Sequence, residues 1–167
     1  MKILSIDTSC DETAAAVTEG VDILSNIIWS QASLHAKFGG VMPSLAQRMH
    51  EERIGWVVDK ALKSAKCTID DVDAIAVTIG PGLSIALGIG IAKAKELSKK
   101  YNKKLIAVNH LEGHLFSSFA ITKNDQFTIN NLQFPAIGLV ISGGNTVLAR
   151  INKIDSYEIL AQTTDDA

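Results

Sequence analysis

The chain has 167 residues, of which 47% are hydrophobic and 20% charged, and its formal net charge is −2. This composition excludes a disordered segment, and the length suits one domain, or one domain and part of another. The balanced charge excludes a global positive field for nucleic acid but leaves room for a local basic patch. The apolar stretch 83–94 contains glycines and is far too short to span a membrane. Two distant cysteines give no disulfide framework, and we expect a reduced, cytoplasmic protein.

The first thirty residues predict three strands. Short apolar runs occupy residues 3–7, 13–17 and 21–29, with turn-forming residues at 11–12 and 19–20. Tight turns of this kind join neighbouring antiparallel strands most economically. The sequence therefore predicts an antiparallel meander at the start of the chain.

The next segment predicts alternating helices and strands. Apolar residues recur with helical spacing between residues 43 and 66, and Pro43 suits the first turn of a helix. The remaining expected elements are helices at 83–101 and 110–120 and strands at 73–78 and 104–109. This order predicts an α/β fold in which helices lie on both faces of a mixed sheet.

The strand pattern of the opening residues then repeats. Polar residues at 123–131 predict a linker, and strands are expected at 135–142, 146–151 and 157–163. We therefore expect a first domain at residues 1–128 and the start of a second at 132–167. Because an uncovered three-strand meander is marginally stable, we expect either a truncated chain or another chain that completes this sheet.

Several segments together resemble one known family, the tRNA N6-adenosine threonylcarbamoyltransferases, called TsaD in bacteria. The matching segments are IDTSCDET at 6–13, residues 35–43, GPG at 80–82, NHLEGH at 109–114, SGGNT at 142–146 and DDA at 165–167. The NHLEGH and SCDET segments are specific, whereas a GPG turn alone is a weak signal. The resemblance implies the fold class of actin, sugar kinases and Hsp70 (ASKHA), with an RNase H-like first domain and the opening strands of a second such domain.

The resemblance also implies an enzyme of tRNA modification. Members of this family transfer threonylcarbamoyl from threonylcarbamoyl-AMP to the N6 amine of the adenosine beside the tRNA anticodon. The implied partners are tRNA, a TsaB-like paralogue and a TsaE-like ATPase. Because family members are about twice this length, we expect the isolated chain to be inactive. A non-catalytic TsaB-like scaffold is one alternative, although such scaffolds lack the histidine pair that His110 and His114 form here. An ASKHA-type ATPase or kinase is the other.

The clearest chemical signal is the pair His110 and His114. Residues four apart on a helix share one face, which suits two ligands of a single metal ion, although two unrelated surface histidines are the alternative. The family resemblance implies one divalent ion, iron or zinc, with a third protein ligand outside this chain, so we expect weak metal binding. We place His35 in a loop and His50 on the exposed side of the first long helix. Glu112 lies about 200° around the helix from His110, which argues against a protease of the HExxH type.

The glycine-containing turn at 142–145 is a candidate substrate site. Glycines let backbone amides approach an anion closely, and a serine adds a hydroxyl donor, although a plain hairpin turn is the alternative. Asn145 stands where the bacterial family pattern usually has histidine. The resemblance implies contacts with the adenylate at Val140, Ile141, Ser142, Gly143, Gly144 and Asn145, and with its ribose at Asp166.

The loop after the first strand is the second candidate. The resemblance suggests that Ser9 contacts the substrate and that Asp11 and Glu12 are catalytic groups that orient a metal or a water, although a turn rich in turn-forming residues is the alternative. Cys10 has no basic neighbour in the sequence that would lower its pKa, so we do not expect a nucleophile.

Two further patterns concern the helix expected at 83–101. Gly88 and Gly90 each cost about 1 kcal/mol relative to alanine, which predicts a close approach of this helix to the sheet. Lysines near the end of the same helix offset its dipole, and a tRNA contact is the alternative. These lysines are Lys93, Lys95, Lys99, Lys100, Lys103 and Lys104.

Overall fold

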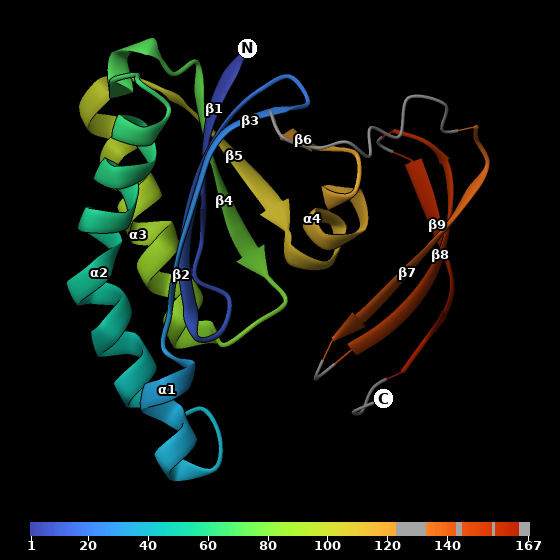
Figure 1. Ribbon diagram of the computed structural model, residues 1–167, viewed down its shortest axis with the longest axis horizontal. Helices are drawn as coiled ribbons and strands as arrows, with labels where there is room; N and C mark the ends of the chain where they lie inside the picture. Colours follow the sequence, from blue (N-terminus) through green and yellow to red (C-terminus); the bar gives the residue numbers. More distant parts are fainter. Residues whose placement is uncertain (123–132, 143–144, 155, 164–167) are drawn as a thin grey trace. The chain divides into compact units, whose positions relative to one another are not determined.

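The computed structural model describes residues 1–122, 133–142, 145–154 and 156–163 (Figure 1). It divides into two compact units, Met1–His110 and Leu111–Ala167, and each is described by itself. The domain boundary expected between residues 128 and 132 lies outside the described residues. Within the described residues, no helix combines the length and the apolar character needed to cross a membrane.

The first unit contains a mixed sheet with the strand order β5-β4-β1-β2-β3. Antiparallel pairing joins β1 to β2 and β2 to β3, which confirms the predicted meander, whereas β1–β4 and β4–β5 are parallel pairs. The strands are β1 (Lys2–Asp7), β2 (Glu12–Glu19), β3 (Asp22–Ser30), β4 (Ala74–Gly80) and β5 (Lys104–Asn109). The helices are α1 (Ala32–His35), α2 (Pro43–Ser64) and α3 (Ser84–Tyr101), with short 3-10 turns at Ala36–Phe38 and Ile69–Asp71.

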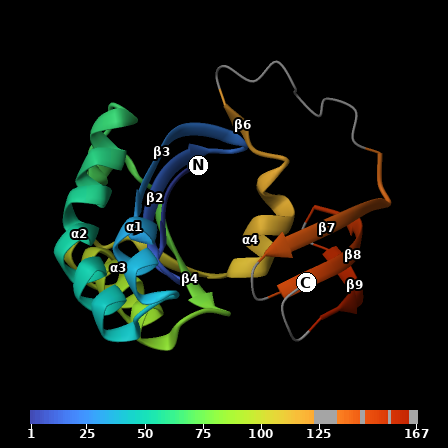
Figure 2. The same cartoon turned by 60° about the horizontal axis from the view of Figure 1, so that its bottom comes forward.

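Both long helices of the first unit, α2 and α3, lie on the same face of this sheet (Figure 2). The prediction of helices on both faces leaves open which face each helix covers, and for α2 and α3 the strand order decides it. The β3–α2–β4 and β4–α3–β5 connections both join parallel strands and both advance in the same direction across the sheet. Because such connections are right-handed, two that advance in the same direction place their helices on the same side.

The core of the first unit lies between the sheet and these helices. Leu4 and Ile6 of β1 alternate with more exposed residues, as a strand with one covered face requires. They pack with Val17 of β2, and α2 contributes Val57, Val58 and Ala61. These positions are buried, so burial of this apolar face positions the end of β1, where the polar residues at 7–9 begin.

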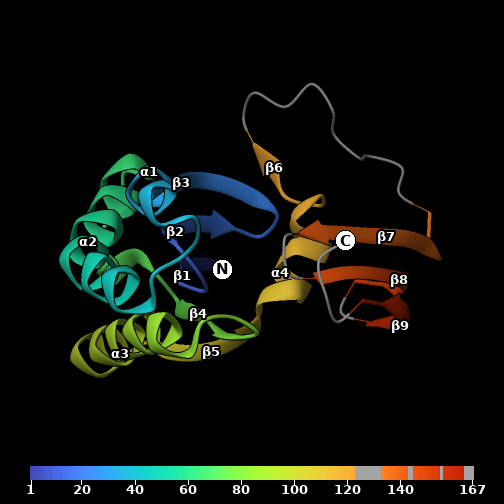
Figure 3. The same cartoon turned by 90° about the horizontal axis from the view of Figure 1, so that it is seen from below.

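The second unit repeats the opening meander. It contains α4 (His110–Ser117), which begins at the last residue of the first unit, β6 (Ile121–Thr122), β7 (Ala136–Ser142), β8 (Asn145–Lys153) and β9 (Ser156–Gln162). The strands β7, β8 and β9 form an antiparallel sheet in that order (Figure 3). Leu115 of α4 packs against one face with Val140, Val147, Ala149 and Ile151. A Cβ at Gly138 would collide with the end of the Leu115 side chain, so glycine lets this side chain pack directly against β7.

Candidate functional site

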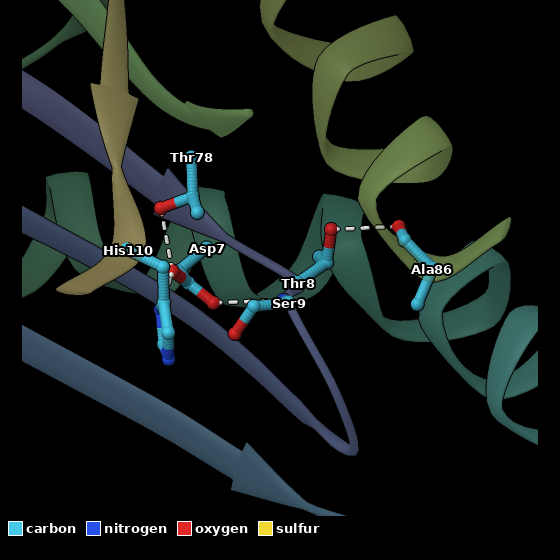
Figure 4. Close-up of polar contacts among 6 residues, drawn as sticks. All are labelled: Asp7, Thr8, Ser9, Thr78, Ala86 and His110. Carbon is cyan, nitrogen blue, oxygen red and sulfur yellow. Dashed lines mark hydrogen bonds and ion pairs between the residues drawn. The ribbon is translucent and has the colours of Figure 1, made fainter. Parts of the chain in front are cut away.

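Three polar side chains meet where β1, β4 and β5 end. These neighbouring strands are parallel, so their carboxyl ends lie at the same edge of the sheet. Asp7 Oδ2 accepts a hydrogen bond from Thr78 Oγ1 at 2.5 Å and lies 3.1 Å from His110 Nδ1, while Asp7 Oδ1 accepts one from the backbone N–H of Ser9 at 2.8 Å (Figure 4). The Asp7 carboxylate is thus held by three partners.

These contacts determine the protonation of the cluster. Burial by itself raises the pKa of Asp7, but the hydrogen bonds from His110, Thr78 and Ser9 outweigh it and hold that pKa well below its usual range. Asp7 is therefore an ionised carboxylate that only accepts hydrogen bonds, so His110 Nδ1 carries the proton that it donates. In the neutral imidazole, the lone pair then belongs to Nε2.

This arrangement fits a metal ligand. Ligating histidines commonly donate their second ring N–H to a carboxylate, which fixes the tautomer and the ring orientation. Helix α4 contains both His110 and His114, as predicted. Among the described residues, no group of three or more His, Cys, Asp or Glu side chains is arranged to hold a metal ion. Two histidines alone are fewer ligands than a divalent first-row ion requires, and metal binding by this pair stays a prediction.

Thr8 connects β1 to α3. Its Oγ1 donates to the carbonyl of Ala86 at 2.8 Å (Figure 4). The same oxygen accepts from the N–H of Gly90 at 3.2 Å, so the hydroxyl bridges two residues one helical turn apart. A Cβ at Gly90 would lie 2.5 Å from this oxygen, which confirms the predicted close approach. At Gly88 the prediction is wrong, because a Cβ there would meet nothing within 4 Å.

The Gly80-Pro81-Gly82 turn packs on Ser9. The Ser9 carbonyl accepts a hydrogen bond from the N–H of Leu83 at 2.7 Å, and Ser9 is 5% exposed. Gly82 has a φ of +155°, and a Cβ there would lie 2.5 Å from the Ser9 carbonyl oxygen. The backbone at Ser9 is therefore fixed from two sides, by Asp7 and by this turn.

The candidate catalytic residues Asp11 and Glu12 lie a few residues after Ser9 in the sequence, where β2 begins. Burial and then the neighbouring Asp11 carboxylate raise the pKa of Glu12, while its Oε1 accepts a hydrogen bond from Ser30 Oγ at 3.2 Å. Burial and then Asp11 also raise the pKa of Cys10 to about 11. At neutral pH Cys10 is therefore a thiol, as expected for a residue that is not a nucleophile.

The predicted positions of His35, in a loop, and His50, on the exposed side of a helix, are wrong. His35 belongs to α1 and is 3% exposed, and His50 lies on the buried face of α2 and is 0% exposed. Each imidazole is hydrogen-bonded through both ring nitrogens. A buried polar ring is stable only when its nitrogens have partners, and these two are satisfied inside the first unit.

The second candidate turn is only partly described. Val140 is buried in the core of the second unit, whereas Ile141 is 69% exposed on the opposite face of β7. Ser142 pairs with Asn145 at the end of the β7–β8 ladder. Gly143, Gly144, Asp166 and the side chain of Asn145 lie outside the described residues.

The lysines of the predicted basic cluster have varied surroundings. Lys93 forms an ion pair with Glu96 at 3.1 Å, and Lys103 Nζ donates to the Asp70 carbonyl at 2.8 Å. Lys99 and Lys100 lie in the last turn of α3, where positive charge offsets the helix dipole.

Sequence reasoning missed the partners of His110. Asp7 and Thr78 lie near the ends of adjacent parallel strands, which is where polar groups gather in α/β sheets. That placement follows once the sheet order is known, whereas the predicted strands alone leave the order open.

The mixed sheet, the polar cluster at its edge and the repeated meander define an ASKHA-type α/β protein. YeaZ from Pseudomonas aeruginosa has a similar fold, with a TM-score of 0.61 and 16% identity, covering 99% of this chain and 69% of that one. A family model described as TsaD, tRNA N6-adenosine threonylcarbamoyltransferase, matches residues 22–167. The chain belongs to this family.

Curated relatives agree with this assignment. Proteins named tRNA N6-adenosine threonylcarbamoyltransferase from Caldicellulosiruptor bescii and Clostridium novyi are 48% and 49% identical over 168 aligned residues. In both cases the match includes 100% of this chain, but 48% and 47% of the relative. The chain therefore spans about half the length of the curated relatives that it matches.

Proposed function

We propose that this chain supplies one wall of an active site that makes N6-threonylcarbamoyladenosine in tRNA. The donor is threonylcarbamoyl-AMP, and the acceptor is the adenosine beside the anticodon. Family membership supports the reaction class. The observation that carries the proposal is the Asp7–His110 pair, which prepares an imidazole as a metal ligand at the same sheet edge as the Asp11–Glu12 loop.

The reaction forms a C–N bond between N6 of adenosine and the carbamoyl carbon. The bond from that carbon to the phosphate oxygen breaks, and AMP leaves with the electron pair. N6 must lose one proton, which requires a base. Glu12 suits this role because its raised pKa brings its basicity closer to neutral pH; burial is the main cause of this shift, and the neighbouring Asp11 carboxylate adds to it.

A divalent iron or zinc ion, when bound, would act as a Lewis acid toward the carbamoyl carbonyl. His110 and His114 would hold it. On the protein side, Asp7 keeps the proton on Nδ1 of His110 and thereby fixes the ring, and Thr78 holds Asp7. The adenylate would contact Ser9 and the turn at 140–145, with Asp166 at the ribose.

The proposed partners are tRNA, a TsaB-like paralogue and a TsaE-like ATPase. An ATPase of the same fold class is the natural rival, since ASKHA proteins share this sheet. Phosphate release from ATP, measured with and without tRNA, separates the two activities.

A hybrid protein tests the transferase proposal. In the Caldicellulosiruptor bescii relative, the half that this chain matches is replaced by this chain. The hybrid is incubated with unmodified tRNA and threonylcarbamoyl-AMP, together with the partner proteins, and nucleosides are quantified by mass spectrometry. We expect the modified nucleoside from the hybrid, a large loss in Glu12→Gln, and no loss in the control Glu19→Gln. A folded hybrid that makes no modified nucleoside, while the parent does, contradicts the proposal.

A further inference from the structure

We propose that His50 is a positioning residue that, together with Gln31, holds the segment 10–12 and thereby directs the Asp11 and Glu12 side chains. This inference rests on the proposed function, because it matters for catalysis only if those carboxylates act on the substrate. His50 itself is fully buried and touches no reacting group.

The first anchor is the carbonyl of Cys10. His50 Nε2 lies 3.0 Å from the Cys10 carbonyl oxygen, and His50 Nδ1 lies 2.8 Å from Thr13 Oγ1. A carbonyl only accepts, so Nε2 carries the proton, and in the neutral ring Nδ1 accepts from the threonine hydroxyl. Burial lowers the pKa of His50 and favours this neutral ring. The imidazole therefore connects both sides of the Asp11–Glu12 pair, from residue 10 to residue 13.

The second anchor is the carbonyl of Asp11. The backbone N–H of Gln31 donates to it at 3.0 Å. The Gln31 side chain is itself fixed, because its Oε1 lies 3.0 Å from His35 Nε2 and its Nε2 donates to the Ala46 carbonyl at 3.5 Å. The N–H of Met42 donates to His35 Nδ1 at 3.2 Å, so His35 Nε2 must be the donor toward Gln31. Every donor in this chain of contacts has a defined acceptor.

The two anchors leave the side chains of the segment directed away from the core. Consecutive carbonyls, those of Cys10 and Asp11, are held by α2 and by the start of α1, whereas Glu12 is exposed and Asp11 is half-buried. With both carbonyls fixed, the peptide planes on either side of Asp11 are fixed too. Burial is the larger cause of the raised pKa of Glu12, and the two carboxylates keep the proximity that adds to it.

Nuclear magnetic resonance on the 167-residue chain tests the proposal. Long-range ¹H–¹⁵N spectra report the tautomer of His50, and ¹³C carboxyl shifts report the titration of Glu12. Amide exchange at Gln31 reports opening of the segment. The variants are Thr13→Val and His50→Gln, and the matched control is Thr18→Val, an isosteric change farther along the same strand.

We expect His50 to carry its proton on Nε2 at pH 7. Thr13→Val should raise the Gln31 exchange rate about fivefold or more, the effect of losing one buried hydrogen bond. It should also move the Glu12 titration toward that of an isolated glutamate, because the two carboxylates separate. A role confined to core stability leaves that titration unchanged. If His50→Gln does not fold, Thr13→Val, which keeps the shape of the core, still decides the question.

A proton on Nδ1 of His50, or a Thr13→Val variant indistinguishable from Thr18→Val in both exchange and Glu12 titration, overturns the proposal. These measurements use no substrate, metal or partner. Failure of the transferase hybrid is therefore distinguishable from failure of the His50 inference.

Discussion

Asp7 and His110 are 103 positions apart in the sequence, yet Asp7 Oδ2 lies 3.1 Å from His110 Nδ1. The contact depends on the sheet order, because β1 and β5 are not neighbours and β4 separates them. Their side chains are partly exposed, 28% for His110 and 30% for Asp7, so the pair lies at the surface of the sheet edge rather than in the core. The fold therefore brings the two side chains together at a position that solvent can reach.

Replacing Asp7 by asparagine should weaken metal binding. The variant keeps the shape of the side chain but loses the negative charge that fixes the proton on His110 Nδ1. Loss of such an orienting carboxylate typically lowers metal affinity about 10- to 100-fold. Zinc titration against a chromophoric chelator measures the change, with Asp22→Asn as control because Asp22 is exposed at the start of β3. Equal affinities for the two variants would mean that Asp7 does not orient the ligand.

The two helix glycines should respond oppositely to alanine. Gly90→Ala places a Cβ 2.5 Å from Thr8 Oγ1, and we expect destabilisation of about 1–3 kcal/mol from overpacking. Gly88→Ala meets nothing within 4 Å, so the higher helix propensity of alanine should raise stability by up to about 1 kcal/mol. Urea unfolding followed by circular dichroism measures both. A Gly90→Ala variant as stable as Gly88→Ala would show that the Thr8 bridge does not restrict α3.

Much of the fold follows from local sequence signals. The opening meander and the long helices carry clear periodicity, and the structure confirms both. The face of the sheet that each helix covers depends on strand order, which no local pattern encodes, so the sequence pattern alone does not assign α2 and α3 to one face. The family resemblance rests on motif spacing, which is read directly from the sequence and requires no knowledge of the packing.

The misplacement of His50 has a different cause. The buried α2 positions Ile54, Val57, Val58 and Ala61 lie 4, 7, 8 and 11 residues after His50. That spacing puts His50 on the apolar face, whereas the polarity of the imidazole by itself predicts an exposed position. His35 gave no such signal, because α1 has four residues and is too short to show a helical period.

Cys10 should react slowly with alkylating agents despite its exposure. With a pKa of about 11, its thiolate fraction at pH 8 is about one in a thousand. In a Cys67→Ser background, the iodoacetamide rate measured by mass spectrometry should rise about tenfold per pH unit, without a plateau up to about pH 10. A plateau below about pH 8 would indicate an activated thiol and would reopen the question of a nucleophile in this loop.

Stability should fall in mild acid because of His50. Burial lowers its pKa below the ordinary 6.5, so on acidification the unfolded chain binds a proton before the folded chain does. The contribution of His50 is therefore fully present above about pH 6.5 and is lost as the pH falls toward the folded-state pKa, by at most about 1.4 kcal/mol per pH unit. Carboxylates with lowered pKa, such as Asp7, act in the same direction but at lower pH.

Because the pKa of Glu12 is also raised, the comparison with His50→Gln is what isolates the histidine in urea unfolding between about pH 5 and 7. Glutamine keeps a donor for the Cys10 carbonyl but cannot titrate, so this variant should be less stable at pH 7 and show a shallower pH dependence. The stability difference between wild type and variant should shrink as the pH falls. A stability difference that stays constant across this range would mean that His50 does not lose a favourable neutral state on acidification. The hydrogen bonds of His50 to Thr13 and Cys10 would then be compatible with a charged imidazole.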